Sequence, residues 1–228
     1  MKPYWEDKSS GITIYCGDCR TVMPTLSKAE MMFTDPPYGV KYTGGTFSKK
    51  QSALKGDETT DLYRDFLPIA RTVVDGPCYM WFAGTQSYDV YSAVHESNYD
   101  IHSLILWVKN CAQMGNVGAH YKQKHEPCLY FKPHGSTLRW CGPNNEVTVW
   151  CVSREAQNLW HPTQKPVALA YRALKNHSAE SVIDPFMGGG STLVAAKMLH
   201  RRAVGIEINE QYCAAVVRRL NQSMKPLV

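Results

Sequence analysis

The order of apolar and polar positions along the chain alternates between short apolar runs and longer stretches with one apolar face. Residues 61–74 are typical of an amphipathic helix, because Leu62, Phe66 and Ile69 share one side at helical spacing. Helices are predicted in the same way at 19–27, 61–74, 87–97, 166–178, 192–200 and 210–222. Apolar runs of strand length, bounded by turn-forming or charged residues, predict strands at 11–18, 29–35, 76–84, 101–110, 125–133, 181–186 and 201–209.

Strands and helices alternate most regularly in the last third of the chain, which predicts an α/β fold with a doubly wound, mostly parallel sheet. The run at 29–35 is mostly apolar without alternation, so we expect it near the centre of the sheet. A further short strand is predicted at 146–153, in a small hairpin. The chain shows no internal repeat, low-complexity tract or linker, so a single domain over residues 1–228 is predicted.

Composition places the chain among ordinary globular proteins, since 44% of its 228 residues are hydrophobic and 20% are charged. The longest apolar stretches, such as 103–108, are far too short to cross a bilayer. The start of the chain has no apolar core of the kind that secretory signals carry. We therefore expect a location in the cytoplasm, or in the cytoplasm of a host cell if the gene is viral, and no contact with a membrane.

Eight cysteines are present, and in a cytoplasmic protein we expect them to be reduced thiols. Cys16 and Cys19 form the one closely spaced pair. No second pair follows at a matching spacing, so the sequence predicts neither a zinc site nor another metal site.

The net charge of +5 is mild, but basic residues gather in two segments. Residues 40–56 contain four lysines and no acid, and residues 120–139 contain four basic residues and the single acid Glu126. Such segments are either solvated loops or contacts with the phosphates of a nucleic acid. The charge alone favours the solvated loops.

Two short motifs carry candidate chemistry. In "TDPPYG" (34–39), two prolines that cannot donate to a sheet end a buried strand and leave Asp35 at its tip. Three glycines at 188–190 separate a strand from a helix, which opens backbone amides at the helix N-terminus to a ligand. Glu207, 19 residues after Gly188 at the end of the next strand, is placed to accept hydrogen bonds from ribose hydroxyls. The glycine loop alone is equally compatible with a tight turn that binds nothing.

A dinucleotide is one candidate ligand for this loop. Against it, Leu193 occupies the place of the third glycine expected for such cofactors, and Asp184 precedes the loop by four residues. No other feature of the sequence indicates hydride chemistry.

Four motifs considered together support a more specific interpretation: "DPPY" (35–38), "HPTQKP" (161–166), "DPFMGGGST" (184–192) and "GIEIN" (205–209). In sequence and order they resemble the beta group of S-adenosylmethionine-dependent amino-methyltransferases, which modify exocyclic amines in DNA, and especially its compact solitary or phage-associated members. The resemblance covers almost the whole chain, and "HPTQKP" ahead of "DPFMGGGST" is its most specific part.

This resemblance implies a Rossmann-like methyltransferase sheet of seven strands in a circularly permuted order. The last two strands of the chain would lie beside the first one, a rearrangement that is physically cheap when the termini are neighbours. The strand that ends at Asp35 would then lie next to the strand that ends at Asp184.

The resemblance also implies S-adenosylmethionine as the cofactor. Asp18 would bind its adenine, with Cys19 lining the same wall. Glu207 would hold its ribose, and Ile208 would pack on the adenine. The other implied cofactor residues would shape the pocket or surround the amino-acid end of the cofactor: Asp35, His161, Thr163, Gln164, Lys165, Asp184, Phe186, Gly188, Gly190, Ser191 and Thr192.

Catalysis is implied for the tetrapeptide 35–38. An exocyclic amine is a poor nucleophile because its lone pair is delocalised into the ring. Asp35 would accept one N–H, and the carbonyl of Pro36 would accept the other. Tyr38 would stack on the base, with Pro37 completing the motif. A base inside a duplex cannot reach such a pocket, so base flipping is expected.

Double-stranded DNA is the implied partner, and this makes phosphate contact the better interpretation of the basic segments. We expect DNA-contact loops at 40–60 and 111–124 and a target-recognition insert at 134–160. So short an insert indicates a short or relaxed recognition sequence, or a contribution from a second subunit in a homodimer. The candidate DNA-binding residues are Lys41, Lys49, Lys50, Lys122, Lys124 and Arg139.

Transfer to N6 of adenine is the preferred reaction, because serine often replaces Asp35 in the cytosine-N4 enzymes of this group. Methylation of cytosine N4 is the alternative. RNA or protein-glutamine methylation is less favoured, because such relatives typically carry asparagine before Pro-Pro-Tyr and an earlier glycine loop. An inactive DNA-binding module is disfavoured, since all the motif residues are present.

Overall fold

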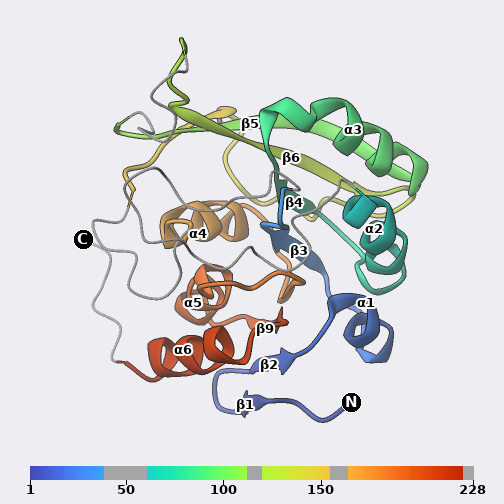
Figure 1. The fold of residues 1–228 in the computed structure, drawn as a ribbon, viewed down its shortest axis with the longest axis vertical. Helices are drawn as coiled ribbons and strands as arrows, with labels where there is room; N and C mark the ends of the chain where they lie inside the picture. The colour runs from blue at the N-terminus through green and yellow to red at the C-terminus, as the bar shows by residue number, and fades with distance from the viewer. Residues whose placement is uncertain (39–60, 112–119, 155–163, 223–228) are drawn as a thin grey trace.

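The computed structural model describes residues 1–38, 61–111, 120–154 and 164–222 (Figure 1). Within these ranges the chain forms one nine-stranded sheet in the order β1-β2-β9-β8-β3-β4-β6-β5-β7. The strands are β1 (Trp5–Asp7), β2 (Ile12–Cys16), β3 (Met31–Thr34), β4 (Cys78–Trp81), β5 (Tyr99–Val108), β6 (His125–Pro133), β7 (Val149–Cys151), β8 (Ser181–Asp184) and β9 (Arg202–Glu207). The helices are α1 (Cys19–Val22), α2 (Asp61–Val73), α3 (Ser87–Glu96), α4 (Val167–Lys175), α5 (Ser191–Met198) and α6 (Glu210–Asn221), with short 3-10 helices η1 (Met23–Thr25) and η2 (Gly84–Gln86).

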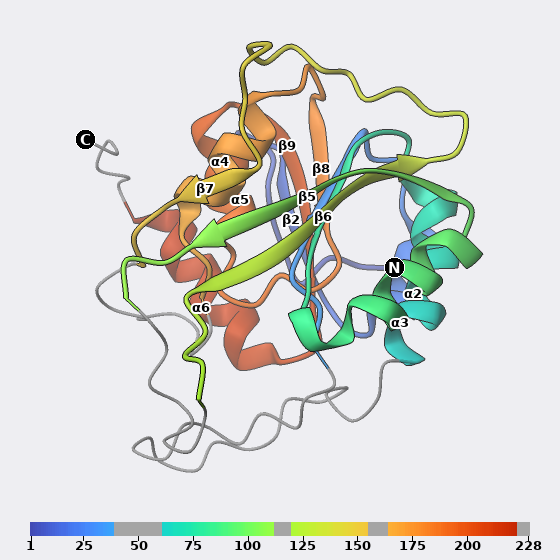
Figure 2. The ribbon, with the colours of Figure 1, turned by 90° about the horizontal axis from the view of Figure 1, so that it is seen from above.

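Helices cover both faces of the sheet, as the doubly wound prediction requires (Figures 1 and 2). On one face, α4, α5 and α6 bury Leu169, Leu193 and Val216 in a core shared with the strands. On the other face, α1 and α2 bury Val22 and Phe66, and α3 extends the same core. Every residue of β3 and β4 is buried, which is the pattern expected of strands covered on both sides.

The sheet is mixed, with a parallel centre. β2, β9, β8, β3 and β4 run parallel, and β7 runs parallel to β5. β6 is antiparallel to both β4 and β5, and β1 is antiparallel to β2. The mostly parallel α/β sheet predicted from the sequence is confirmed. Because β6 is reversed, its first residues lie at the same edge of the sheet as the last residues of β3, β4 and β5.

The prediction of seven strands is too low for the described residues. The seven strands of the first group and the further strand predicted at 146–153 are all present, the latter as β7, and β1 is added; β1 and β7 form the two edges of the sheet. The predicted hairpin at 146–153 is wrong, because β7 pairs in parallel with β5 and places Trp150 opposite Trp107. Trp150 is buried in the core, so the alternation of apolar residues did indicate a strand. The strand that pairs with it is distant in sequence. β1 was not predicted from the sequence, because Glu6 and Asp7 interrupt any apolar pattern.

The permuted strand order implied by the resemblance is confirmed. β8 and β9 come last in the chain, yet they lie between β2 and β3. Gly205 pairs with Ile14, and Val182 pairs with Met31. Gly205 also makes room for the glycine loop, since a Cβ at this position would lie 2.5 Å from Sδ of Met187.

A buried histidine, His177, connects the end of α4 to the sheet. Its Nδ1 lies 2.6 Å from the carbonyl oxygen of Leu138, and its Nε2 lies 2.9 Å from the hydroxyl of Tyr79. A carbonyl can only accept, so Nδ1 carries the proton, Nε2 accepts from Tyr79 and the ring is neutral. Burial lowers the pKa of His177 to about 4.

Stability should therefore depend on pH through His177. Between about pH 6.5 and about pH 4 the unfolded chain binds a proton that the buried ring does not, so this contribution is lost as the pH falls. The advantage of wild type over His177→Gln in free energy of unfolding should shrink by up to about 3 kcal/mol across this window. Urea denaturation at several pH values measures the difference, and a difference that does not change with pH would contradict a buried neutral ring.

Candidate active site

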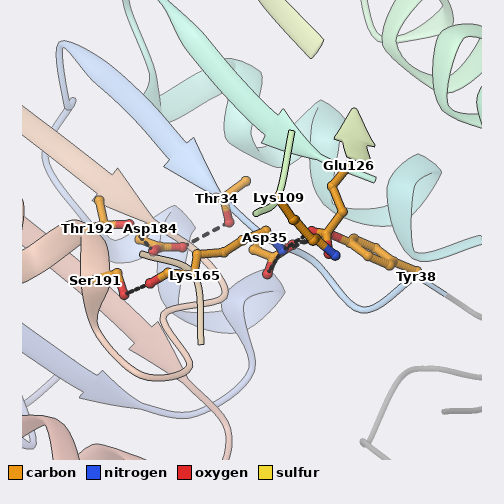
Figure 3. Close-up of polar contacts among 9 residues, drawn as sticks. All are labelled: Thr34, Asp35, Tyr38, Lys109, Glu126, Lys165, Asp184, Ser191 and Thr192. Atoms are coloured by element: carbon orange, nitrogen blue, oxygen red, sulfur yellow. Dashed lines mark hydrogen bonds and ion pairs between the residues drawn. The ribbon is translucent and has the colours of Figure 1, made fainter. Parts of the chain in front are cut away.

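The ends of β3 and β8 meet at one edge of the sheet, where Figure 3 shows a cluster of polar side chains. Thr34 is the last residue of β3, and its Oγ1 donates to Oδ1 of Asp184, the last residue of β8, at 2.9 Å. Asp35 therefore leaves the sheet beside Asp184. The sequence motifs predicted that these two strand ends are neighbours, and this prediction is confirmed.

Asp184 is buried and held by three donors. Besides Thr34, the hydroxyl of Thr192 donates at 2.6 Å and the amide of Phe186 at 3.2 Å. Burial raises the pKa of Asp184 to about 7, against the effect of these three donors. The carboxyl group joins β3, β8 and the start of α5, a position that suits the expected role in shaping a pocket.

Asp35 keeps 25% of its side chain exposed, so one side of the carboxylate is open. Its Oδ1 accepts from the hydroxyl of Tyr38 at 2.5 Å, and its Oδ2 accepts from the ammonium of Lys165 at 2.6 Å. Burial raises the pKa of Asp35, while the positive charge of Lys165 acts to lower it. An ionised carboxylate with an open side can accept an N–H from a substrate amine.

The ammonium of Lys165 contacts acidic side chains of this site. It was expected at the amino-acid end of a cofactor, but it contacts Asp35, lies 3.0 Å from the hydroxyl of Tyr38, and pairs with Oε2 of Glu126 at 3.0 Å. A motif fixes where a lysine stands in the chain, whereas the direction of its long side chain depends on which acids the fold brings near it.

Two residues of this site were missed by the sequence reasoning, Glu126 and Lys109. Lys109 follows β5 and donates to Glu126 at the start of β6. The two strands pair with Val108 opposite His125. Pairing the two apolar runs as an antiparallel hairpin would have placed the lysine beside the glutamate, so the signal was present in the sequence.

The glycine loop and Glu207 also lie together, at the ends of β8 and β9. Gly188 and Gly190 have φ angles of 49° and 73°, in the left-handed region that favours glycine. The amide of Gly188 donates to Oε2 of Glu207 at 3.0 Å, and the amide of Asn209 donates to Oε1 at 2.9 Å. Burial raises the pKa of Glu207, and these amides act in the opposite direction.

Other expected cofactor residues border this loop. Cys16 at the end of β2 pairs with Glu207, so Asp18 follows at the same edge, where it accepts from the amide of Arg20 at 2.8 Å and caps α1. Ile208 is 48% exposed and presents an apolar surface there. The same edge carries Cys19, Gln164, Phe186, Ser191 and Thr192. His161 and Thr163 lie outside the described residues.

The candidate DNA-binding residues divide into three groups. Lys122 and Lys124 are exposed and lead into β6 at the same edge as Asp35. Arg139 does not belong to this site, because its guanidinium lies 3.9 Å from Glu30, which directly precedes β3 at the opposite edge of the sheet. Closeness in sequence to an expected insert does not decide which edge a loop follows. Lys41, Lys49 and Lys50 lie outside the described residues.

Among the residues that the structure describes, no group of three or more His, Cys, Asp or Glu side chains could hold a metal ion. All eight cysteines are free thiols. None of the helices in the described ranges is both long enough and apolar enough to span a bilayer.

Replacing Thr34 or Thr192 by valine should destabilise the protein by about 1–3 kcal/mol, because an oxygen of the buried Asp184 loses its donor. Urea denaturation measures the change. Thr72→Val is the matched control, since its exposed hydroxyl bonds only the carbonyl of Ile69, and it should cost less than about 0.5 kcal/mol. Equal costs at Thr34 and Thr72 would show that the bond to Asp184 does not stabilise the strand ends.

Comparison with known proteins agrees with this geometry. A family model described as "DNA methylase", covering N6 and N4 enzymes, matches residues 29–218. The chain is 26% identical over 251 residues to the Type II methyltransferase M2.MboI of Moraxella bovis, covering 97% of this chain and 92% of that protein.

Its fold is similar to that of M1.HpyAVI in a complex with SAM (TM-score 0.73, 24% identity, 92% of this chain and 100% of that one). It is also similar to the cytosine-N4-specific PvuII DNA methyltransferase (TM-score 0.78, 15% identity, 99% of this chain and 91% of that one). These likenesses confirm the predicted methyltransferase fold, and because the family model spans most of the chain, this protein belongs to the N6/N4 DNA methylase family.

Proposed function

We propose that this protein transfers a methyl group from S-adenosylmethionine to the exocyclic N6 amine of adenine in DNA. The observation that carries the proposal is the position of Asp35, a partly open carboxylate joined through Thr34 to Asp184. The glycine loop and Glu207 share the same edge of the sheet. Membership of the DNA methylase family and the similarity to Type II methyltransferases support the reaction class.

The residues around the glycine loop fit the cofactor by their chemistry. Glu207 uses two acceptor positions for backbone amides, and a carboxylate offers about four, so positions are left for ribose hydroxyls. Ile208 offers exposed apolar surface for a purine ring. The carboxylate of Asp18, which pairs with Arg20 in this structure, lies at the same edge and is the proposed acceptor for the amino group of the purine. When bound, S-adenosylmethionine supplies a methyl group activated by attachment to a positively charged sulfur.

Asp35 and the carbonyl of Pro36 would activate the amine of the base. Each accepts one N–H, and together they favour a nitrogen with a localised lone pair. This nitrogen would gain positive charge as it bonds to the methyl carbon, while the carbon–sulfur bond of the cofactor breaks and leaves its electron pair on a neutral sulfur. Asp35 would stabilise the charge on the nitrogen and take up its surplus proton. Tyr38, whose hydroxyl holds Oδ1 of Asp35, provides an aromatic ring for stacking on the base.

The base would have to leave the duplex to reach these groups, because Asp35 is only 25% exposed and Pro36 is buried. Extrusion costs a few kcal/mol, which contacts elsewhere on the DNA must offset. The exposed Lys122 and Lys124 are suited to bind phosphates next to the site. Together with the rest of the loops at 40–60 and 111–124, they form the proposed DNA contact.

The proposed target-recognition insert at 134–160 contributes mainly through its last part. Its first residues follow the edge opposite Asp35, whereas β7 ends beside β5 at the edge that carries the site. A target-recognition insert this short suits a short recognition sequence.

Incubation of the protein with unmethylated double-stranded DNA and labelled S-adenosylmethionine tests the proposal, with the modified nucleoside identified after digestion. We expect label in N6-methyladenine. Label in N4-methylcytosine would overturn the choice of base while leaving the reaction class intact. Absence of label from DNA, with label in RNA or protein instead, would overturn the substrate.

Asp35→Ala should reduce the rate of methyl transfer at least about 100-fold, because it removes the group that accepts the N–H and stabilises the charge. Binding of the cofactor, measured by calorimetry, should change less than about threefold, a difference below 0.7 kcal/mol. Asp75→Ala is the control, since Asp75 is exposed at the other edge of the sheet and should leave the rate unchanged. Transfer at the wild-type rate by Asp35→Ala would exclude Asp35 from catalysis.

A further inference from the structure

Four charged side chains form a row beside the proposed catalytic tetrapeptide, and their signs alternate: Lys109, Glu126, Lys165 and Asp35 (Figure 3). They come from four segments, namely the end of β5, the start of β6, the residues before α4 and the end of β3. The side chains of Lys109 and Lys165 are only 1% and 9% exposed. The two lysines of the row are therefore buried, unlike those of the exposed ion pairs that contribute little to a protein.

Such a row needs an explanation, because burying two ammonium groups is unfavourable unless each is paired. Here Lys109 pairs with Glu126, and Lys165 pairs with both Glu126 and Asp35. Aromatic rings complete the surroundings, with Trp107 lying 5.2 Å from Nζ of Lys109. Apolar residues of similar size often fill a core at least as stably as buried ion pairs do. Stability alone therefore gives no reason for the row.

Lys165 fixes the geometry of the catalytic carboxylate. Its ammonium holds Oδ2 of Asp35 and also lies 3.0 Å from the hydroxyl of Tyr38, which in turn donates to Oδ1. The carboxylate is thus held from both oxygens, and each oxygen keeps a further acceptor position. Burial raises the pKa of Asp35, and the charge of Lys165 is the largest opposing influence.

Glu126 and Lys109 support Lys165 in turn. Burial acts to raise the pKa of Glu126, but Lys165 and Lys109 together lower it to about 2, so Glu126 stays charged at neutral pH. The negative charge of Glu126 offsets the positive charge of the Lys165 ammonium. Without it, this ammonium would repel the positive charge that appears on the attacking nitrogen. Lys109 keeps Glu126 in place through its own ion pair.

The backbone of Lys165 is fixed from the other side of the site. The hydroxyl of Ser191, at the start of α5, donates to the carbonyl of Lys165 at 2.6 Å. The residue therefore connects the glycine loop to Asp35, with its main chain bonded to one and its side chain bonded to the other.

We propose that Lys165 is a positioning residue for methyl transfer, which holds Asp35 ionised and in one orientation, and that Glu126, itself held by Lys109, supports Lys165 in this position. This inference rests on the proposed function and adds three residues to it. It differs from a role for Lys165 in binding the amino-acid end of the cofactor. A positioning role predicts a loss of kcat, whereas a binding role predicts a weaker cofactor Kd.

Lys165→Met separates these roles. We expect kcat to fall about 10- to 100-fold, as for loss of a hydrogen bond between charged groups, with cofactor Kd changed less than about threefold. The acid limb of the pH profile of kcat should move to higher pH, because Asp35 holds a proton more tightly without the Lys165 ammonium. Lys165→Arg keeps the charge and should return the acid limb toward its wild-type position. A cofactor Kd weakened more than about tenfold with an unmoved acid limb would overturn the proposal.

A second measurement does not require turnover. In protein labelled with ¹³C at the aspartate carboxyl carbons, the Asp35 signal is assigned by its absence from Asp35→Asn, and its titration is followed by NMR. We expect Lys165→Met to titrate at higher pH than wild type. An unchanged titration would overturn the proposal, whereas a shifted titration in a protein that methylates no DNA would reject only the proposed function.

The supporting pair is tested by comparing Glu126→Gln with the double variant Glu126→Gln/Lys109→Met. Glu126→Gln leaves the buried Lys109 without its acid, so the double variant should be the more stable in urea denaturation. Glu126→Gln should also lower kcat at unchanged cofactor Kd. Lys175→Met, at an exposed lysine, is the control for loss of one positive charge. A Glu126→Gln protein with wild-type stability and wild-type kcat would show that Glu126 and Lys109 do not support Lys165.

Discussion

The hydrogen bond between Thr34 and Asp184 is the contact on which the rest of the site depends. It joins residues 150 positions apart at the ends of two parallel strands. Because Thr34 is followed at once by Asp35, and Asp184 is followed by the glycine loop, fixing these two strand ends also fixes the distance between the two halves of the site. Thr192 donates to the second oxygen of Asp184 and extends this constraint to α5.

Besides Asp18, four carboxyl groups lie at this edge, and two kinds of donor hold them. Asp184 is held by two hydroxyls and an amide, and Glu207 by two backbone amides. Asp35 and Glu126 share an ammonium. Hydroxyls and amides leave the negative charge in place and only solvate it, whereas an ammonium cancels it. The two groups that neutral donors hold lie on the side proposed for the cofactor, and the two paired acids lie beside the position proposed for proton transfer.

The sequence predicted those parts of the site that are contiguous in the chain. Asp35, Asp184 and Glu207 each end an apolar run, and the resemblance to DNA amino-methyltransferases implied that these strand ends lie together. Two failures have a common cause. The partner of β7 and the edge followed by Arg139 are set by packing against Trp107 and Glu30, which are distant in sequence. The direction of Lys165 likewise depends on Glu126, which enters the site only because β6 runs opposite to its neighbours.

The reversal of β6 has a wider consequence for how the site is assembled. Had β6 run parallel to β4, Glu126 would begin at the far edge and Lys109 would have no acid beside it. Antiparallel pairing of β5 with β6 instead brings Lys109 and Glu126 to the edge where β3 ends. The segment between these two strands, which carries the exposed Lys122 and Lys124, therefore starts and finishes at the edge of the sheet where β3 ends. One reversed strand thus brings both the buried charges around Asp35 and the exposed Lys122 and Lys124 to a single edge of the sheet.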